Sequence, residues 1–463
     1  MIRKKTLSRP PRLWLLTIIG LAGGFSLLGA GCPLFPPTAP TNPTEPTEPE
    51  EPTTPFDHTT ASFVGTDVCA GCHADIAAKF ANNGHQYKLN KVEGGVPPTY
   101  PFTSLAGKLA GISDDDTDIA GGLVDPAAGT DNPAGTPASW NDVTYVIGGF
   151  GWKARWIDSQ GFIVTGTNVQ YNFATDGFSS YHNNQNDKKY NCGNCHTTGW
   201  KAYTSEAGDD RNKNRQDGLA GMEGTFFAPG VHCEACHGAG SAHAASPSKN
   251  NITKIATART TEQYMADDMA ANVPMACSDC HVRDSEKDYP TYTGGDGVIL
   301  ASGGFIRHHE QYDEKQGLIP DDVAAGPTGP HRDLACIACH DPHKTIKYED
   351  ISGDGSALIK TCADCHPGHE ITSGGMQSLD CTDCHMPKLV KSAVASAAVG
   401  TGPSEGDIHS HIFRIDLSKT DQFVADGSKA YPWITPEWAC KTCHNGVDAT
   451  DFSLSSLASQ NIH

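Results

Sequence analysis

The stretch NCGNCHTTGW, residues 191–200, decides how this chain is read. Cys192 and Cys195 stand three positions apart, and His196 follows the second cysteine directly. Taken alone, the pattern fits a redox-active dithiol, half of a zinc site or the attachment point of a larger cofactor. The rest of the chain separates these three interpretations.

The pattern Cys-x-x-Cys-His occurs eight times in the 463 residues, and the first to eighth motifs are numbered here in chain order. They use sixteen of the seventeen cysteines, and the remaining one is Cys32. The motif cysteines are Cys69, Cys72, Cys192, Cys195, Cys233, Cys236, Cys277, Cys280, Cys336, Cys339, Cys362, Cys365, Cys381, Cys384, Cys440 and Cys443. The histidines that complete the motifs are His73, His196, His237, His281, His340, His366, His385 and His444.

Covalent haem attachment explains this spacing. Two thiols three residues apart can add to the two vinyl groups of one protoporphyrin, and the next histidine can bind its iron as an axial ligand. Zinc ribbons pair two Cys-x-x-Cys units and need no histidine after each. A thioredoxin-like site is a single motif in a βαβ context, which is absent here, and disulfides leave the histidines unexplained. The sequence therefore predicts eight c-type haems.

Thirteen further histidines can supply the second axial ligands. His343 is three residues beyond His340, and this tether is too short to reach the opposite face of the same porphyrin. If His343 is a ligand, it must bind a different haem, and the same reasoning applies to His369. We expect bis-histidine ligation for most haems. By position, His85, His182, His331 and His369 are expected to be distal ligands, while His232, His308 and His409 are competitors, and His58 and His463 are interpreted as non-ligands.

The amino terminus places the protein outside the cytoplasm. Residues 1–31 combine a basic start with an apolar run and are predicted to be a signal peptide. Cys32 ends the sequence LLGAGC and is predicted to carry a lipid, with residues 32–61 as a proline-rich linker. The formal charge is −20, so nucleic acid is a poor partner.

The body of the chain is predicted to be mostly irregular, with short α-helices packed around haem. Residues 62–190 are expected to hold the first haem and a β-rich patch at 143–173, and residues 191–463 the other seven haems. Short helices are expected at 74–83 and 260–271, and the rest is expected to be loop. Because loop this extensive lacks cohesion of its own, the haems are expected to form most of the core.

Several segments of the sequence resemble segments of multihaem c-type cytochromes of anaerobic and metal-reducing bacteria. This group of cytochromes includes octahaem proteins of the superfamily that contains tetrathionate and hydroxylamine-oxidising enzymes. These segments, which extend the likeness over roughly 63–444, are YNCGNCHTTGW, GVHCEACHGAGSAH, RHHEQYD, CIACHDPH, CTDCHMPK and GDIHSHIFRID. By this resemblance the distal ligands would include His243, His309, His343 and His411.

The sequence favours an electron carrier over an enzyme, and no side chain is assigned a catalytic role. All eight motifs end in histidine, without the lysine variant of nitrite reductases. The expected partners are other redox proteins, an extracellular electron acceptor and the membrane, through lipidated Cys32. The expected location is the outer membrane or cell surface, facing the outside or the periplasm. The alternatives are an oxidoreductase of a small nitrogen or sulfur oxyanion and a subunit of an extracellular cytochrome filament.

Overall fold

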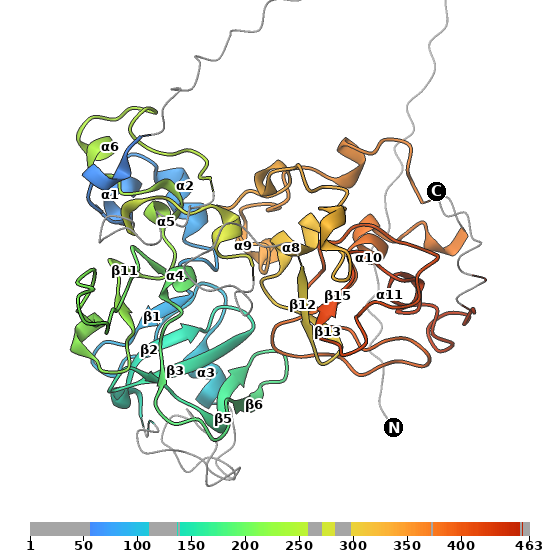
Figure 1. Cartoon of the computed structure of the whole chain (residues 1–463), viewed down its shortest axis with the longest axis horizontal. Coiled ribbons are helices and arrows are strands. Elements are labelled where there is room, and N and C mark those ends of the chain that lie inside the picture. The colour runs from blue at the N-terminus through green and yellow to red at the C-terminus, as the bar shows by residue number, and fades with distance from the viewer. Residues whose placement is uncertain are drawn as a thin grey trace, which may run out of the picture. The chain divides into compact units, whose positions relative to one another are not determined.

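The protein was analysed as a computed structural model (Figure 1), which describes residues 56–110, 137, 139–257, 271–282, 298–371, 374–453 and 456. The predicted signal peptide, Cys32, the linker up to residue 55, the predicted helix at 260–271 (except Ala271) and His463 lie outside the described residues. Among the described residues, no helix is long and apolar enough to cross a membrane.

The predicted β-rich patch is confirmed, and it belongs to a larger antiparallel sheet of seven strands (Figure 1). Its strands run in the order β1-β2-β3-β4-β7, and β5 pairs with β3 and β6. They are β1 Leu89–Lys91, β2 Val143–Gly148, β3 Lys153–Asp158, β4 Phe162–Ile163, β5 Gly166–Asn172, β6 Gly177–Tyr181 and β7 Lys188–Lys189. The segment DSQG, residues 158–161, forms the turn from β3 to β4, where the Asp158 carboxylate accepts from the Gln160 and Phe162 amides, both at 2.9 Å.

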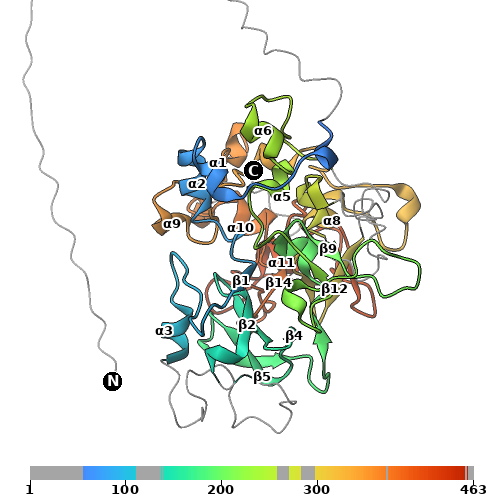
Figure 2. The same ribbon diagram turned by 90° about the vertical axis from the view of Figure 1, so that its left-hand side faces the viewer.

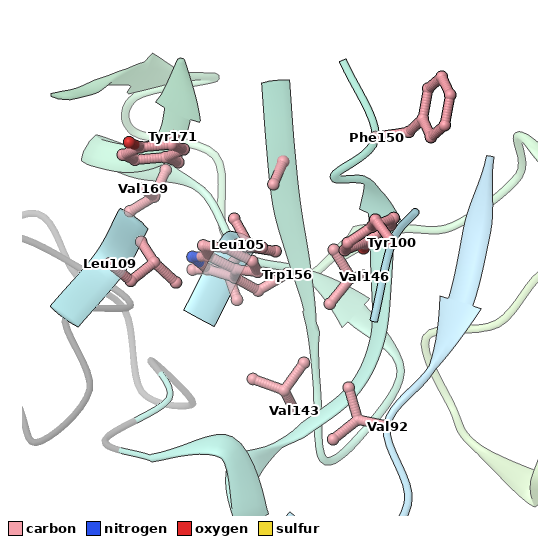
Figure 3. Close-up of a cluster of buried hydrophobic side chains, with 12 residues drawn as sticks. Val92, Tyr100, Leu105, Leu109, Val143, Val146, Phe150, Trp156, Val169 and Tyr171 are labelled. Carbon is pink, nitrogen blue, oxygen red and sulfur yellow. The ribbon is translucent and has the colours of Figure 1, made fainter. Parts of the chain in front are cut away.

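One face of this sheet packs around Trp156, which is fully buried. Leu105 and Leu109 come from helix α3 (Leu105–Ala110) and lie beside Trp156, as Figure 3 shows. Val146 and Tyr171 from β2 and β5 complete the contact. This part of the chain therefore has an ordinary aromatic and aliphatic core, and the expectation that haem forms most of the core does not hold for it.

A second sheet was missed by the prediction that the rest is loop. It has four strands in the order β14-β13-β12-β15. They are β12 Ile299–Ser302, β13 Phe305–Arg307, β14 Val390–Lys391 and β15 Lys429–Ala430. Each strand is two to four residues long. Strands β12 and β13 form a hairpin across Gly303 and Gly304, whereas β14 and β15 come from distant parts of the sequence. Segments this short show too little periodicity to be recognised as strands.

The helices are short, as predicted. The helix expected at 74–83 is α2 (Ala74–Phe80), which follows α1 (Thr66–Ala70). The helices α5 (Cys233–His237) and α6 (Ser241–Ala245) lie close to α1 and α2, as Figures 1 and 2 both show. The remaining described α-helices are α4 Gly193–His196, α8 Gln311–Gln316, α9 Glu349–Ser352, α10 Cys381–His385 and α11 Pro436–Cys440.

Two small ladders follow the second motif and fix its surroundings. Strand β8 (Thr197–Thr198) pairs with β11 (Ala228–Pro229), and β9 (Lys201–Ala202) pairs with β10 (Gly224–Thr225). Thr197 and Thr198 are buried, and their hydroxyls donate to the Gly193 and Gly230 carbonyls at 2.6 and 2.9 Å. The third motif begins only four residues after β11, so this ladder also brings the second and third motifs together.

Candidate haem sites

Each motif is folded into one tight turn that gathers its thiols and its imidazole. In the fourth motif the His281 amide donates to the Cys277 carbonyl at 2.8 Å, and the corresponding bond in the first motif, from His73 to Cys69, is 2.9 Å. All sixteen motif cysteines are described, and none forms a disulfide. A single turn thus presents the two sulfur atoms and the nitrogen ligand that one c-type haem requires.

An aspartate inside three of the motifs explains why the turn forms there. In the sequences CSDCH, CADCH and CTDCH the carboxylate reaches back to the amide of the residue before the first cysteine. Asp279, Asp364 and Asp383 accept from these amides at 2.9, 2.6 and 2.8 Å. This is the reciprocal half of a capping box, and it closes the first turn of the helix.

Three motif histidines are oriented in a way that suits metal binding. The Nδ1 atoms of His237, His385 and His444 lie 2.7, 2.8 and 3.1 Å from the backbone carbonyls of Thr253, Phe413 and Thr450. A carbonyl only accepts, so Nδ1 carries the proton and Nε2 keeps a lone pair. Such a bond is the usual support of a metal-bound imidazole.

Five motif histidines face a second histidine at the spacing that a shared metal would set. Two imidazoles that bind one metal ion from opposite sides, each at about 2 Å, have ring centroids about 6 Å apart. The observed pairs are His73–His243 at 6.2 Å, His237–His343 at 6.2 Å, His281–His85 at 6.1 Å, His340–His411 at 6.2 Å and His366–His331 at 5.9 Å.

The pairing of His343 agrees with the tether argument. His343 does not face the histidine of its own CHDPH segment but His237 of the third motif, with the two rings 3° from parallel. Its Nδ1 lies 3.1 Å from the Asp341 carboxylate, which leaves Nε2 directed away from that bond. The ring contact with His237 therefore agrees with the prediction that His343, if it is a ligand, binds a haem other than that of the fifth motif.

His366 has two histidine neighbours. His331 lies at 5.9 Å and His369 at 6.3 Å between ring centroids. His369 is three residues from His366, so the tether argument excludes it from the opposite face of the same haem. His331 is then the partner that the sixth motif can use.

The fourth motif is also crowded. His309 lies 5.7 Å from His281, closer than His85 at 6.1 Å, and it has a positive φ of 69°. His308 lies against His309 at 4.7 Å. The His309 imidazole also interacts electrostatically with His196 of the second motif.

His182 and His409 are placed less centrally. His182 is exposed at the end of β6 beside Tyr181, with a φ of 46°. His409 is exposed too, and its Nδ1 lies 2.5 Å from the Met386 carbonyl, which positions it next to the seventh motif.

Two histidines have both ring nitrogens in hydrogen bonds. His232 contacts the Thr66 hydroxyl at 3.2 Å and the Pro229 carbonyl at 2.8 Å. His58 contacts the Ala239 carbonyl at 3.1 Å and the Thr253 hydroxyl at 2.8 Å, and it is buried. With Nε2 engaged in this way, neither ring has a free lone pair directed at a metal. His232 is therefore a weaker candidate than its place beside Cys233 suggests, and His58 has the hydrogen-bonded role expected of a non-ligand.

Interactions between thiols relate the motifs to one another. Cys69 lies near Cys233, Cys280 near Cys195, Cys277 near Cys336, and Cys362 near Cys381, and in each case the neighbour contributes to a raised thiol pKa. Weaker interactions join Cys236 to Cys277, Cys339 to Cys362, and Cys384 to Cys440. These interactions relate the fourth motif to the second, third and fifth, the first to the third, and the sixth to the fifth and seventh, with the eighth near the seventh.

Burial sets the charge state of the paired imidazoles. It lowers the pKa of His85 to about 3, that of His281 to about 4 and that of His411 to about 3. These rings are neutral at pH 7, which is the form that binds a metal. Together with the paired thiols and the ring spacing, the residues of these motifs fit covalently bound haem.

Several functional candidates near the motifs were not identified from the sequence. Glu314 is fully buried, its carboxylate accepts the His411 amide, and burial raises its pKa to about 8. The Tyr190 hydroxyl is buried two residues before Cys192 without a hydrogen-bond partner. Burial lowers the pKa of Lys88, and interactions with Cys280 and Cys195 oppose that shift. No spacing pattern in the sequence identifies these residues, because tertiary contacts determine their surroundings.

Comparison with known proteins gives structural matches only. No family model matches the chain, and no curated protein matches it. The chain is similar to the undecahaem cytochrome from the S-layer of Carboxydothermus ferrireducens, with 17% identity and a TM-score of 0.42, over 86% of this chain and 59% of that one. It therefore spans less than two thirds of that cytochrome's length.

Two further solved structures are similar over most of this chain. The octahaem sulfite reductase of Wolinella succinogenes matches at 16% identity and a TM-score of 0.48, over 88% of this chain and 71% of that one. The outer cell wall cytochrome OcwA matches at 16% identity and a TM-score of 0.44, over 86% and 85%. By their descriptions, two of these three proteins are cytochromes and one is an octahaem reductase.

Proposed function

We propose that this protein is an extracytoplasmic electron carrier that holds eight covalent c-type haems in one continuous array. The observation that carries the proposal is the set of histidine pairs, in which five motif histidines each face a histidine from elsewhere at 5.9–6.2 Å. Zinc ribbons and dithiol sites do not require histidines paired in this way.

In this proposal the chain supplies attachment, ligands and spacing. Each Cys pair holds one haem, the motif histidine binds one face, and the facing histidine binds the other. When bound, the haems supply one-electron redox chemistry at potentials set by ligands, burial and hydrogen bonds. The contacts between thiols of successive motifs support short distances between neighbouring haems. Irons with two histidines leave no position for substrate, which favours electron transfer over catalysis.

The proposed setting follows from the amino terminus. A signal peptide and a lipid on Cys32 would attach the mature chain to the outer membrane or cell surface, and the proline-rich segment would separate it from the lipid. There it would exchange electrons with other redox proteins and with an extracellular acceptor. The negative formal charge of −20 favours partners with basic surfaces.

The test combines haem counting with spectroscopy on the mature protein. Intact mass and pyridine haemochrome assays should give eight haems per chain, none extracted by acid acetone. The oxidised protein should be low-spin throughout by electron paramagnetic resonance, and the reduced protein should not bind carbon monoxide. Fewer than eight haems would refute the array. Stoichiometric binding of carbon monoxide or nitrite at one haem would replace the carrier with the oxidoreductase alternative.

A further inference from the structure

Asn83 lies in the short segment between α2 and β1, and its side chain is buried. Its backbone amide donates to the Phe80 carbonyl at 2.9 Å, which fixes its place at the end of α2. Its side chain makes three further hydrogen bonds, each to a different backbone group. These groups lie at or beside His85 and His343, two histidines that face motif histidines.

The side-chain oxygen of Asn83 holds the backbone of His85. Oδ1 of Asn83 accepts the His85 amide at 2.9 Å. The His85 carbonyl accepts the Val231 amide at 3.0 Å, so both backbone polar groups of His85 are engaged. The His85 ring lies 6.1 Å from the His281 ring of the fourth motif. These bonds therefore fix the backbone from which the His85 imidazole reaches that motif.

The side-chain nitrogen of Asn83 holds the segment that contains His343. Nδ2 donates to the Pro342 carbonyl at 2.9 Å and to the Lys344 carbonyl at 2.6 Å, so it grips the chain on both sides of His343. These partners are 259 and 261 positions away in the sequence, so the contact is tertiary. The His343 ring faces His237 of the third motif at 6.2 Å, with the two rings 3° from parallel.

The three bonds use both N–H donors of the Asn83 amide and fix the direction in which it faces. Exchanging its two ends would point the oxygen at two carbonyl oxygens and the nitrogen at a backbone N–H. Every one of these groups would then lack a partner, which is costly in a buried place. The side chain therefore ties the backbone of one histidine to the backbone around the other.

We propose that Asn83 is a positioning residue that holds two distal ligands at once, His85 for the haem of the fourth motif and His343 for the haem of the third. The inference rests on the proposed haem binding. An axial histidine that leaves reduced iron opens a position for carbon monoxide. Loosening the backbone of either histidine should therefore make the corresponding haem reactive toward that gas.

Two substitutions and one matched control test this. Asn83→Ala removes all three side-chain bonds. Asn83→Asp keeps an oxygen for the His85 amide and loses the amino group that binds the two carbonyls. Asn82→Ala is the control, because the side chain of this neighbouring asparagine donates to the Asp354 carboxylate at 2.8 Å instead.

The carbon monoxide bound by each reduced holoprotein is counted against its haem content. About a quarter of the haem, two of eight, should bind the gas in Asn83→Ala, and about an eighth in Asn83→Asp. The wild type and Asn82→Ala should bind none. Excess imidazole should slow the binding in both Asn83 variants, because it competes for the vacated positions.

The other outcomes are decisive as well. No binding in Asn83→Asp, equal binding in the two Asn83 variants, or binding in Asn82→Ala would overturn the inference. Binding at more than two haems would show a general loss of structure and equally overturn it. If Asn83→Ala does not accumulate, Asn83→Asp alone decides. A wild type with fewer than eight haems, or one that itself binds carbon monoxide, would mark a failure of the proposed function and not of the role of Asn83.

Discussion

At the scale of single residues, the roles of the histidines depend on what each ring nitrogen contacts. His343 and His232 illustrate the contrast, since both lie close to a motif in the sequence. His343 faces the His237 ring, whereas His232 uses both nitrogens in hydrogen bonds to Thr66 and Pro229. The sequence makes His343 an expected distal ligand and His232 a competitor, and the contacts of the two rings favour His343.

This contrast yields a paired prediction. His343→Ala should convert one haem per chain to high spin, because the face opposite His237 loses its ligand, and added imidazole should restore the low-spin spectrum. His232→Ala should remain low-spin throughout, at a cost of about 1–3 kcal/mol in stability from lost hydrogen bonds. Resonance Raman spectra of the oxidised variants measure the outcome. A high-spin signal in His232→Ala alone would exchange the two assignments.

At the scale of secondary-structure elements, the two faces of the first sheet have different cores. Trp156 on β3 is fully buried between α3 and neighbouring strands, where its contacts are to aliphatic and aromatic side chains (Figure 3). A second cluster of the same sheet, which includes Tyr145 and Ile157, packs against Cys192 of the second motif. The packing around Trp156 should therefore be separable from haem attachment.

Trp156→Ala tests that separation. Removing so large a buried side chain should cost about 3–5 kcal/mol and lower the thermal unfolding midpoint. Ser180→Ala, at an exposed position of β6, serves as the control and should change stability by less than about 0.5 kcal/mol. Calorimetry and limited proteolysis report the change, and the haem count should stay the same in both variants. A loss of haem in Trp156→Ala would show that the sheet and the motifs fold as one unit.

The elements also show what the sequence can and cannot predict. Cys192, Cys195 and His196 are identifiable because covalent attachment constrains residues within one turn. The β-rich patch is identifiable because Ala154 and Trp156 alternate with polar neighbours along β3. The sheet formed by β12, β13, β14 and β15 was missed, because its strands are very short and β14 and β15 join it only through tertiary contacts. For the same reason the short distance in sequence from His340 could exclude the haem of the fifth motif as a site for His343, but it could not identify His237 as the partner.

At the scale of the whole molecule, the chain is interpreted as a lipid anchor, a spacer and a haem-bearing body. Cys32→Ser removes the cysteine proposed to carry the lipid, and the other sixteen cysteines belong to motifs. We expect the variant to move from the membrane fraction to the soluble fraction with its haem count unchanged. Fractionation followed by haem staining measures this. Continued membrane association of the variant would mean that another segment or a partner protein holds the chain.

The interactions among the thiols also make the fourth motif a hub of the proposed array. Through Cys280, Cys277 and the nearby Cys236, it is related to the second, fifth and third motifs. One link bypasses it, since His343, three residues after the fifth motif, lies 6.2 Å from His237 of the third motif. In the proposed array, a defect at the fourth motif would therefore affect three neighbours at once, and the link between the third and fifth motifs would provide redundancy.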